Sequence, residues 1–203
     1  MKRVALSIVS ISMAVSGIIA LLAGETRNSR DPEFTENNQL VRPVNYREWI
    51  YVSSGLGMSY APANQTDASR PMFDNVFVEP SAYRSFLSTG RWPDKTIFVL
   101  EVRSSSSHGS INTGGSFQDA LVGVEAEVKD ESRFPEKWAY FSFRENGRLK
   151  DTAPALPQGS CFSCHHTSGA VENSFTQFYP TLLPVAIAKG TLNPGYKPDT
   201  NQK

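Results

Sequence analysis

The chain has few residues that bind metals or form cross-links, with two cysteines and three histidines among 203 residues. It also lacks an excess of either charge, because 20 Lys and Arg residues balance 20 Asp and Glu residues. A nucleic-acid or polyanion binder would show a basic excess, so neither class is expected. An apolar content of 39% and an aromatic content of 11% fit a globular fold and argue against wholesale disorder. The length allows one domain with a substantial core, or at most two small ones.

The first 24 residues differ in kind from the rest of the chain. Lys2 and Arg3 precede an uncharged run from Val4 to Gly24, which is typical of a secretory signal or an N-terminal membrane anchor. The basic start would hold the N-terminus in the cytoplasm and send the remainder across the membrane. We therefore expect an exported, periplasmic protein, either cleaved near Ala23 or tethered to the inner membrane by residues 4–24. Residues 25–42 are expected to form a flexible linker, residues 43–190 the folded domain, and residues 191–203 a C-terminal tail.

Several short segments in the middle of the chain are rich in β-branched and aromatic residues, and the segment 120–130 alternates between apolar and polar residues. These segments predict strands at 75–79, 96–105, 120–130 and 138–143, and a helix is predicted between Pro80 and Gly90. Short helical segments are also expected near 46–52 and within 172–190, and loops at 55–71 and 108–116. Consecutive strands with turn-like links favour an α+β fold, mainly an antiparallel sheet with short flanking helices.

Both cysteines and two of the histidines lie in the stretch "QGSCFSCHHTSG", residues 158–169. Cys161, Cys164 and His165 form the pattern Cys-x-x-Cys-His, the attachment signal for a c-type haem. Two thiols at this spacing can reach the two vinyl groups of one porphyrin, and the next histidine can then bind the iron. We therefore expect one covalently bound haem c, held by Cys161 and Cys164, with His165 as the iron ligand.

Other interpretations of the pattern are weaker. Structural zinc needs four ligands, a thioredoxin-like pair needs a βαβ context, and a disulfide across so short a loop is strained.

His166 is expected to face solvent or a haem propionate. Candidates for a sixth iron ligand are His108, Met58 and Met72, and each of these lies in an expected loop.

The haem motif sits near the C-terminus of a chain that is mainly sheet, and this combination resembles the cytochrome P-460 family, including the cytochromes c′-beta. The matching stretches are "NYREWIYV", "FVEPSAYRSFLSTGRWPDKTIFVLEV", "GVEAEVKDESRF", "WAYFSF", "CFSCHH" and "SFTQFYPTL", in family order over about residues 43–185. The resemblance implies a sheet that packs over one haem face, an iron site open to small ligands, and often a homodimer.

The resemblance also identifies a departure from the catalytic members. Members that oxidise hydroxylamine carry a lysine crosslinked to the haem, and that position falls on Leu100 here; a distal arginine of those members falls near Asp74. Leucine has no nitrogen for the crosslink. Lys95 is an odd number of residues away and is expected on the other face of the strand.

Side chains along a β-strand point alternately to its two faces, and this alternation predicts which of them face the haem. If Leu100 does, Phe98 and Val102 share its face, and Asp74 and Val76 form one row of the neighbouring strand. An apolar Phe98/Leu100 cap resembles the c′-beta branch and would favour uncharged diatomic ligands such as NO; the alternative is that both side chains are simply core residues.

We therefore expect an exported mono-haem cytochrome that binds NO-like ligands, or passes electrons to a redox partner protein. The alternative is an enzyme that oxidises hydroxylamine or a related small nitrogen compound.

Overall fold

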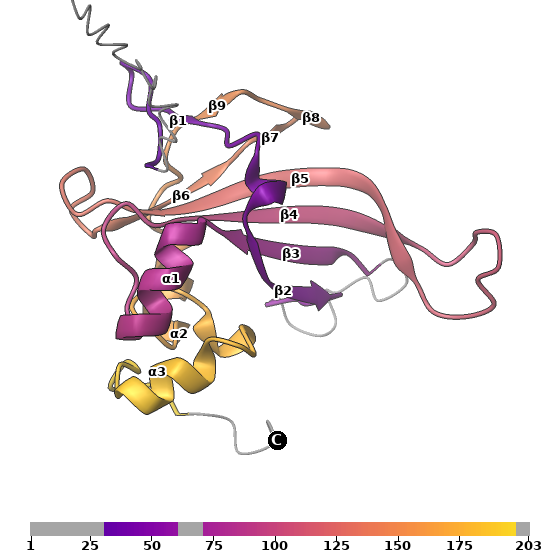
Figure 1. Cartoon of the computed structure of the whole chain (residues 1–203). Helices are drawn as coiled ribbons and strands as arrows, with labels where there is room; N and C mark the ends of the chain where they lie inside the picture. The colour runs from indigo at the N-terminus through magenta and orange to yellow at the C-terminus, as the bar shows by residue number, and fades with distance from the viewer. Residues whose placement is uncertain (1–30, 61–70, 198–203) are drawn as a thin grey trace, which may run out of the picture.

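A five-stranded antiparallel sheet forms the centre of the molecule in the computed structural model, which describes residues 31–60 and 71–197 (Figure 1). Its strands follow one another in sequence order across the sheet: β2 (Ile50–Leu56), β3 (Phe73–Val78), β4 (Ile97–Ser106), β5 (Phe117–Lys129) and β6 (Trp138–Ser142). The α+β class and the mainly antiparallel sheet are thus confirmed. Each strand is rich in β-branched or aromatic residues, which fit a pleated sheet covered on both faces.

Three short helices lie on one side of the sheet, which we call the pocket face: α1 (Pro80–Thr89), α2 (Phe162–Ser168) and α3 (Leu183–Lys189) (Figure 1). Helix α1 starts and ends as its sequence predicts. The carboxylate of Glu79 accepts hydrogen bonds from the backbone N–H groups of Ser81 and Ala82, at 2.7 and 3.1 Å. Gly90 ends the helix with a φ of 72°, a left-handed conformation that glycine adopts without a steric penalty. The predicted helical segment at 172–190 divides into a 3₁₀ turn (Thr176–Phe178) and α3.

Small elements cover the opposite side of the sheet, which we call the back face. Strand β1 (Leu40–Val41) pairs with β9 (Thr152–Ala153), and β7 (Arg144–Glu145) and β8 (Arg148–Leu149) form a hairpin (Figure 1). Asn146 and Gly147 make the turn of this hairpin, both with positive φ, as their sequence predicts.

The flexible linker predicted for residues 25–42 is wrong over the described part, 31–42. Leu40 is fully buried, and Phe34 makes edge contacts with Phe134 and Phe141 at ring-centroid distances of 6.0 Å. A few apolar side chains within a polar segment are enough to close over one face of the sheet. They show no periodicity because β1 has only two residues.

The helix predicted near residues 46–52 is also wrong. Only a single 3₁₀ turn forms (Tyr46–Glu48), and β2 begins at Ile50. Ile50, Tyr51 and Val52 are β-branched or aromatic, and pairing with β3 outweighs the partial helical spacing of this segment.

The sheet separates two apolar cores. The back-face core includes Val99, Val124 and Phe141, and the pocket-face core includes Phe86, Trp92 and Phe98. The predicted C-terminal tail begins inside the packed structure, since buried Thr191 donates a hydrogen bond from Oγ1 to the carbonyl of Gly90 at 2.7 Å.

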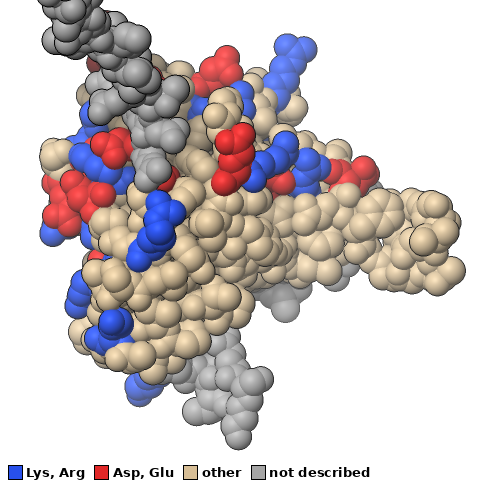
Figure 2. Space-filling view, in the orientation of Figure 1, with Lys and Arg blue, Asp and Glu red and all other residues tan. Residues whose placement is uncertain are grey.

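Strands β4 and β5 extend beyond their neighbours as a projecting arm (Figure 1). Residues 104–118 contain no Lys, Arg, Asp or Glu, and the projecting arm in Figure 2 shows no charged side chains over most of its length. Within the described ranges no helix is long and apolar enough to cross a membrane. The predicted signal or anchor at residues 1–24 lies outside those ranges.

Candidate haem site

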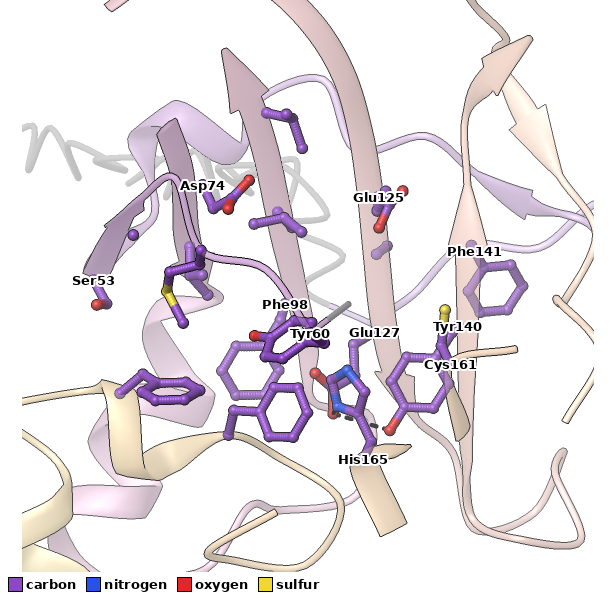
Figure 3. A pocket seen from close by; sticks show the side chains of 18 of the residues that line it. Ser53, Tyr60, Asp74, Phe98, Glu125, Glu127, Tyr140, Phe141, Cys161 and His165 are labelled. Carbon is purple, nitrogen blue, oxygen red and sulfur yellow. Dashed lines mark hydrogen bonds and ion pairs between the residues drawn. The ribbon is translucent and has the colours of Figure 1, made fainter. Parts of the chain in front are cut away.

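A cavity of about 310 Å³ lies between the pocket face of the sheet and the segment that carries the Cys-x-x-Cys-His motif (Figure 3). Strands β3, β4, β5 and β6 supply one wall. Cys161, His165, Phe175 and Tyr179 supply much of the opposite wall. The motif and the predicted distal strand, some sixty residues apart in sequence, therefore meet at one cavity.

Helix α2 determines how the motif residues are presented. Cys161 precedes the first helical residue, and the backbone N–H of His165 bonds to its carbonyl at 3.1 Å, so the two lie one turn apart on one side of the helix. Both line the cavity, whereas Cys164 is exposed and does not. The two cysteines form no disulfide. Among the described residues, no group of three or more His, Cys, Asp and Glu is arranged to hold a metal ion.

Four neighbours fix the His165 ring. Its Nδ1 lies 2.9 Å from the backbone carbonyl oxygen of Asn173 and 3.7 Å from Oε1 of Glu127. Phe175 stacks on the ring at a centroid distance of 4.0 Å, and Tyr140 lies at 4.4 Å. Burial lowers the pKa of His165, but the Glu127 carboxylate and the Asn173 carbonyl outweigh this and raise it above its usual value. With Nδ1 held by these acceptors, Nε2 is the nitrogen left to bind iron.

A tight loop after α2 brings the Asn173 carbonyl to His165. A Cβ atom at Gly169 would lie 2.7 Å from the His165 carbonyl oxygen and 2.9 Å from that of Ser174, so only glycine fits. Asn193 braces the same loop, donating from Nδ2 to the carbonyls of Gly169 and Glu172 at 2.8 and 2.6 Å. The residues after the helix are therefore held as firmly as the motif itself.

The predicted rows of the sheet are those observed. Phe98, Leu100 and Val102 all line the cavity, as do Asp74 and Val76 of the neighbouring strand. Leu100 pairs with Val76 on one side and with Glu125 on the other. Directly paired residues project to the same face of a sheet, so Glu125 lies beside Leu100. The structure thus places Phe98 and Leu100 on the cavity wall, and their contact with a haem stays a prediction.

Three acidic residues, Asp74, Glu125 and Glu127, line the cavity beside the apolar side chains of Phe98 and Leu100 (Figure 3). Burial raises the pKa of Asp74, and burial followed by the nearby Asp74 charge raises the pKa of Glu125. The alternation of β5 puts Glu125 and Glu127 on one face of the strand, opposite Val124, Ala126 and Val128. No local pattern shows that the C-terminal segments cover this acidic face.

The other residues that the sequence suggested as haem contacts or iron ligands do not gather at one place. Lys95 forms an ion pair with Asp130 at the start of β4 and does not line the cavity. His166 turns away from the cavity, stacking on Phe162 at 5.3 Å with its Nδ1 3.3 Å from the side-chain oxygen of Asn173. Of the suggested sixth ligands, Met58 lines the cavity, whereas Met72 and His108 do not.

The comparison with curated proteins finds no match for this chain. The comparison with protein-family models agrees with the arrangement described above. The model of one protein family, Cytochrome P460, matches residues 43–176, which is more than half of the chain and includes the sheet and the motif. The cavity, the motif on α2 and this match lead to one conclusion, that the chain belongs to the cytochrome P460 family.

Proposed function

We propose that this chain is an exported cytochrome with one covalent haem c, which binds small uncharged ligands such as NO beside Phe98 and Leu100, passes electrons to a redox partner, or does both. Membership of the cytochrome P460 family supports haem binding. The observation that carries the ligand-binding role is Leu100. It stands on the cavity wall at the position where the resemblance places the crosslinking lysine of catalytic members.

Cys161 and His165 line the cavity and Cys164 lies on the same short helix, so the motif fits a haem. Cys161 and Cys164 would hold the porphyrin by thioether bonds, and His165 would bind the iron through Nε2. The haem supplies an iron with a coordination position for a small ligand. Phe98, Leu100 and Val76 present an apolar wall that excludes water and favours uncharged ligands. Asp74 and Glu125 line the same cavity, and their carboxylates can accept a hydrogen bond from a polar ligand.

One observation favours a second function, the oxidation of hydroxylamine or a related small nitrogen compound. Such a reaction releases protons, and Asp74 and Glu125 beside the cavity could accept them. Leu100 argues against this function because it cannot form the lysine crosslink. A turnover assay with hydroxylamine and an artificial electron acceptor separates the two. We expect no turnover above that of free haem, and multiple turnovers per haem would favour the enzyme.

The absorption spectrum of the reduced protein tests the main proposal. We expect five-coordinate ferrous haem that takes up NO and CO. A strongly red-shifted Soret band would reveal a crosslinked chromophore and contradict the role given to Leu100. A six-coordinate low-spin spectrum would indicate a dedicated electron-transfer cytochrome. The Cys161→Ala variant should retain haem less well, and unchanged covalent haem would contradict its role as an anchor.

Export and assembly belong to the same proposal. We propose that residues 1–24 direct the chain to the periplasm as a cleaved signal or an anchor, and that the protein forms a homodimer. Fractionation of cells into periplasm and membrane tests the first point, and sedimentation of the purified holoprotein tests the second. Cytoplasmic haem-free protein, or a monomer at micromolar concentration, would contradict them.

A further inference from the structure

Glu127 is the charged side chain closest to the Nδ1 side of His165. It is 8% exposed and lies on β5, the central strand of the cavity wall. Its Oε1 is 3.7 Å from Nδ1 of His165, beyond hydrogen-bond length but well within the range of a strong electrostatic interaction in a buried site.

The hydrogen bonds around Glu127 connect it to the same acceptor that holds His165. The hydroxyl of Tyr140 lies 3.1 Å from the Asn173 carbonyl oxygen and 3.4 Å from Oε1 of Glu127. Glu127 and Tyr140 are also cross-strand partners, so their relative position is fixed by the sheet. The Nδ1 of His165 thus faces two acceptors, the Asn173 carbonyl and the Glu127 carboxylate, and the single hydroxyl proton of Tyr140 is shared between the same two acceptors. Figure 3 shows Glu127 and Tyr140 beside His165.

We propose that Glu127 is a positioning residue for the His165 imidazole. Glu127 fixes the tautomer of this ring and strengthens electron donation from His165 to the haem iron. This inference rests on the proposed function, because it requires His165 as the iron ligand. A negative charge near the N–H of a ligating imidazole makes the other nitrogen a better donor. A better donor stabilises the ferric state, so Glu127 should lower the reduction potential of the haem.

The chain offers a matched control on the same strand. Glu125 lies two residues from Glu127 on the same face of β5 and lines the same cavity, but no hydrogen bond or ion pair joins it to His165 among the described residues. The charge of Glu125 acts on His165 only through space, so Glu125→Gln removes a carboxylate from the same wall without removing a contact to the imidazole N–H. Tyr140→Phe provides a test of the opposite sign, since it keeps the ring against His165 and removes the hydroxyl that competes for both acceptors.

The experiment measures the iron–histidine stretching frequency of the ferrous holoprotein by resonance Raman spectroscopy, together with the reduction potential. In Glu127→Gln we expect a lower stretching frequency and a higher potential. In Tyr140→Phe we expect the reverse, and in Glu125→Gln an unchanged frequency with a smaller change in potential. If Glu127→Gln does not retain haem, Tyr140→Phe still gives a result.

Two outcomes would overturn the inference. One is an unchanged frequency in both Glu127→Gln and Tyr140→Phe; the other is an equal effect of Glu127→Gln and Glu125→Gln, which would indicate only the general charge of the cavity. Wild-type protein without covalent haem, or without an iron–histidine band, would instead contradict the proposed function. The two failures are therefore distinguishable.

Discussion

On the back face of the sheet, the buried carboxylate of Glu101 accepts hydrogen bonds from Tyr46 at 2.5 Å, from Arg47 at 2.9 Å and from Arg103 at 2.8 Å. On the pocket face, Asp74 and Glu125 have no hydrogen-bond partner among the described residues. The two faces thus differ in how they treat acidic groups. Burial alone would raise the pKa of Glu101, but its donors bring it below the usual value, whereas the pKa of Asp74 and that of Glu125 are raised.

The difference separates a structural carboxylate from carboxylates that are available for binding. A fully paired buried acid stabilises one arrangement of the chain, and its removal leaves several donors without a partner. Unpaired acids at a cavity wall weaken the fold when ionised, and they persist where they can serve a ligand. Replacing residues on each face tests this comparison.

The largest expected effect concerns the back-face core. Leu40→Ala removes a fully buried side chain from the segment that covers this face. We expect the free energy of unfolding of the holoprotein to fall by about 2–5 kcal/mol. The shift of the urea midpoint measures this loss. An effect below about 0.5 kcal/mol, typical of an exposed linker residue, would show that residues 31–42 do not pack on the sheet.

The Glu101→Gln substitution should cost somewhat less. It keeps the shape of the side chain but removes the charge that Arg47 and Arg103 contact, and about 1–3 kcal/mol of stability should be lost at pH 7. Arg47 is 55% exposed at its side chain, and solvent screening keeps the effect from being larger.

The same pair has a defined pH dependence. Because the pKa of Glu101 is lower in the folded state, its contribution is present above the unfolded pKa and is lost as pH falls through the folded pKa. The difference in stability between wild type and Glu101→Gln should be constant between about pH 5 and 7 and shrink below about pH 4. Urea titrations across this range provide the measurement, and a difference that grows on acidification would contradict the account.

The smallest effect should appear on the pocket face, and with the opposite sign. Asp74→Asn removes an ionised group that the folded state disfavours, so the variant should be more stable than wild type at pH 7, by less than about 1 kcal/mol. Since the pKa of Asp74 is raised by folding, the wild-type carboxyl is tolerated at low pH and becomes unfavourable as pH rises through its folded pKa. The advantage of Asn should therefore vanish below about pH 4. A destabilised Asp74→Asn variant at pH 7 would show that this acid has a structural partner.

Much of the fold could be predicted because several segments carry a strong local signal. The apolar run of β4, the alternation in β5 and the Pro80 to Gly90 pattern of α1 are enough to predict these two strands and one helix. Leu40 and Phe34 could not be recognised as core residues, since their partners are distant in sequence. Similarly, Ile50 and Val52 form a strand only because β3 lies beside them.

The candidate site was predictable in its motif and not in its surroundings. Cys161, Cys164 and His165 stand at a spacing that porphyrin chemistry requires. Phe98 and Leu100 share one face of β4 because side chains alternate between the two faces of a strand. Glu127 and the Asn173 carbonyl reach His165 only through the strand register and the Gly169 loop. Their contribution depends on distances that no local pattern contains.

The intact mass of the purified, exported protein under denaturing conditions tests the central claim most directly, that Cys161, Cys164 and His165 form the attachment site of one haem c. The account predicts the mass of the polypeptide plus one haem, and the mass of the polypeptide alone for a variant in which Cys161 and Cys164 are both replaced by Ala. A wild-type protein with the mass of its polypeptide alone would contradict it.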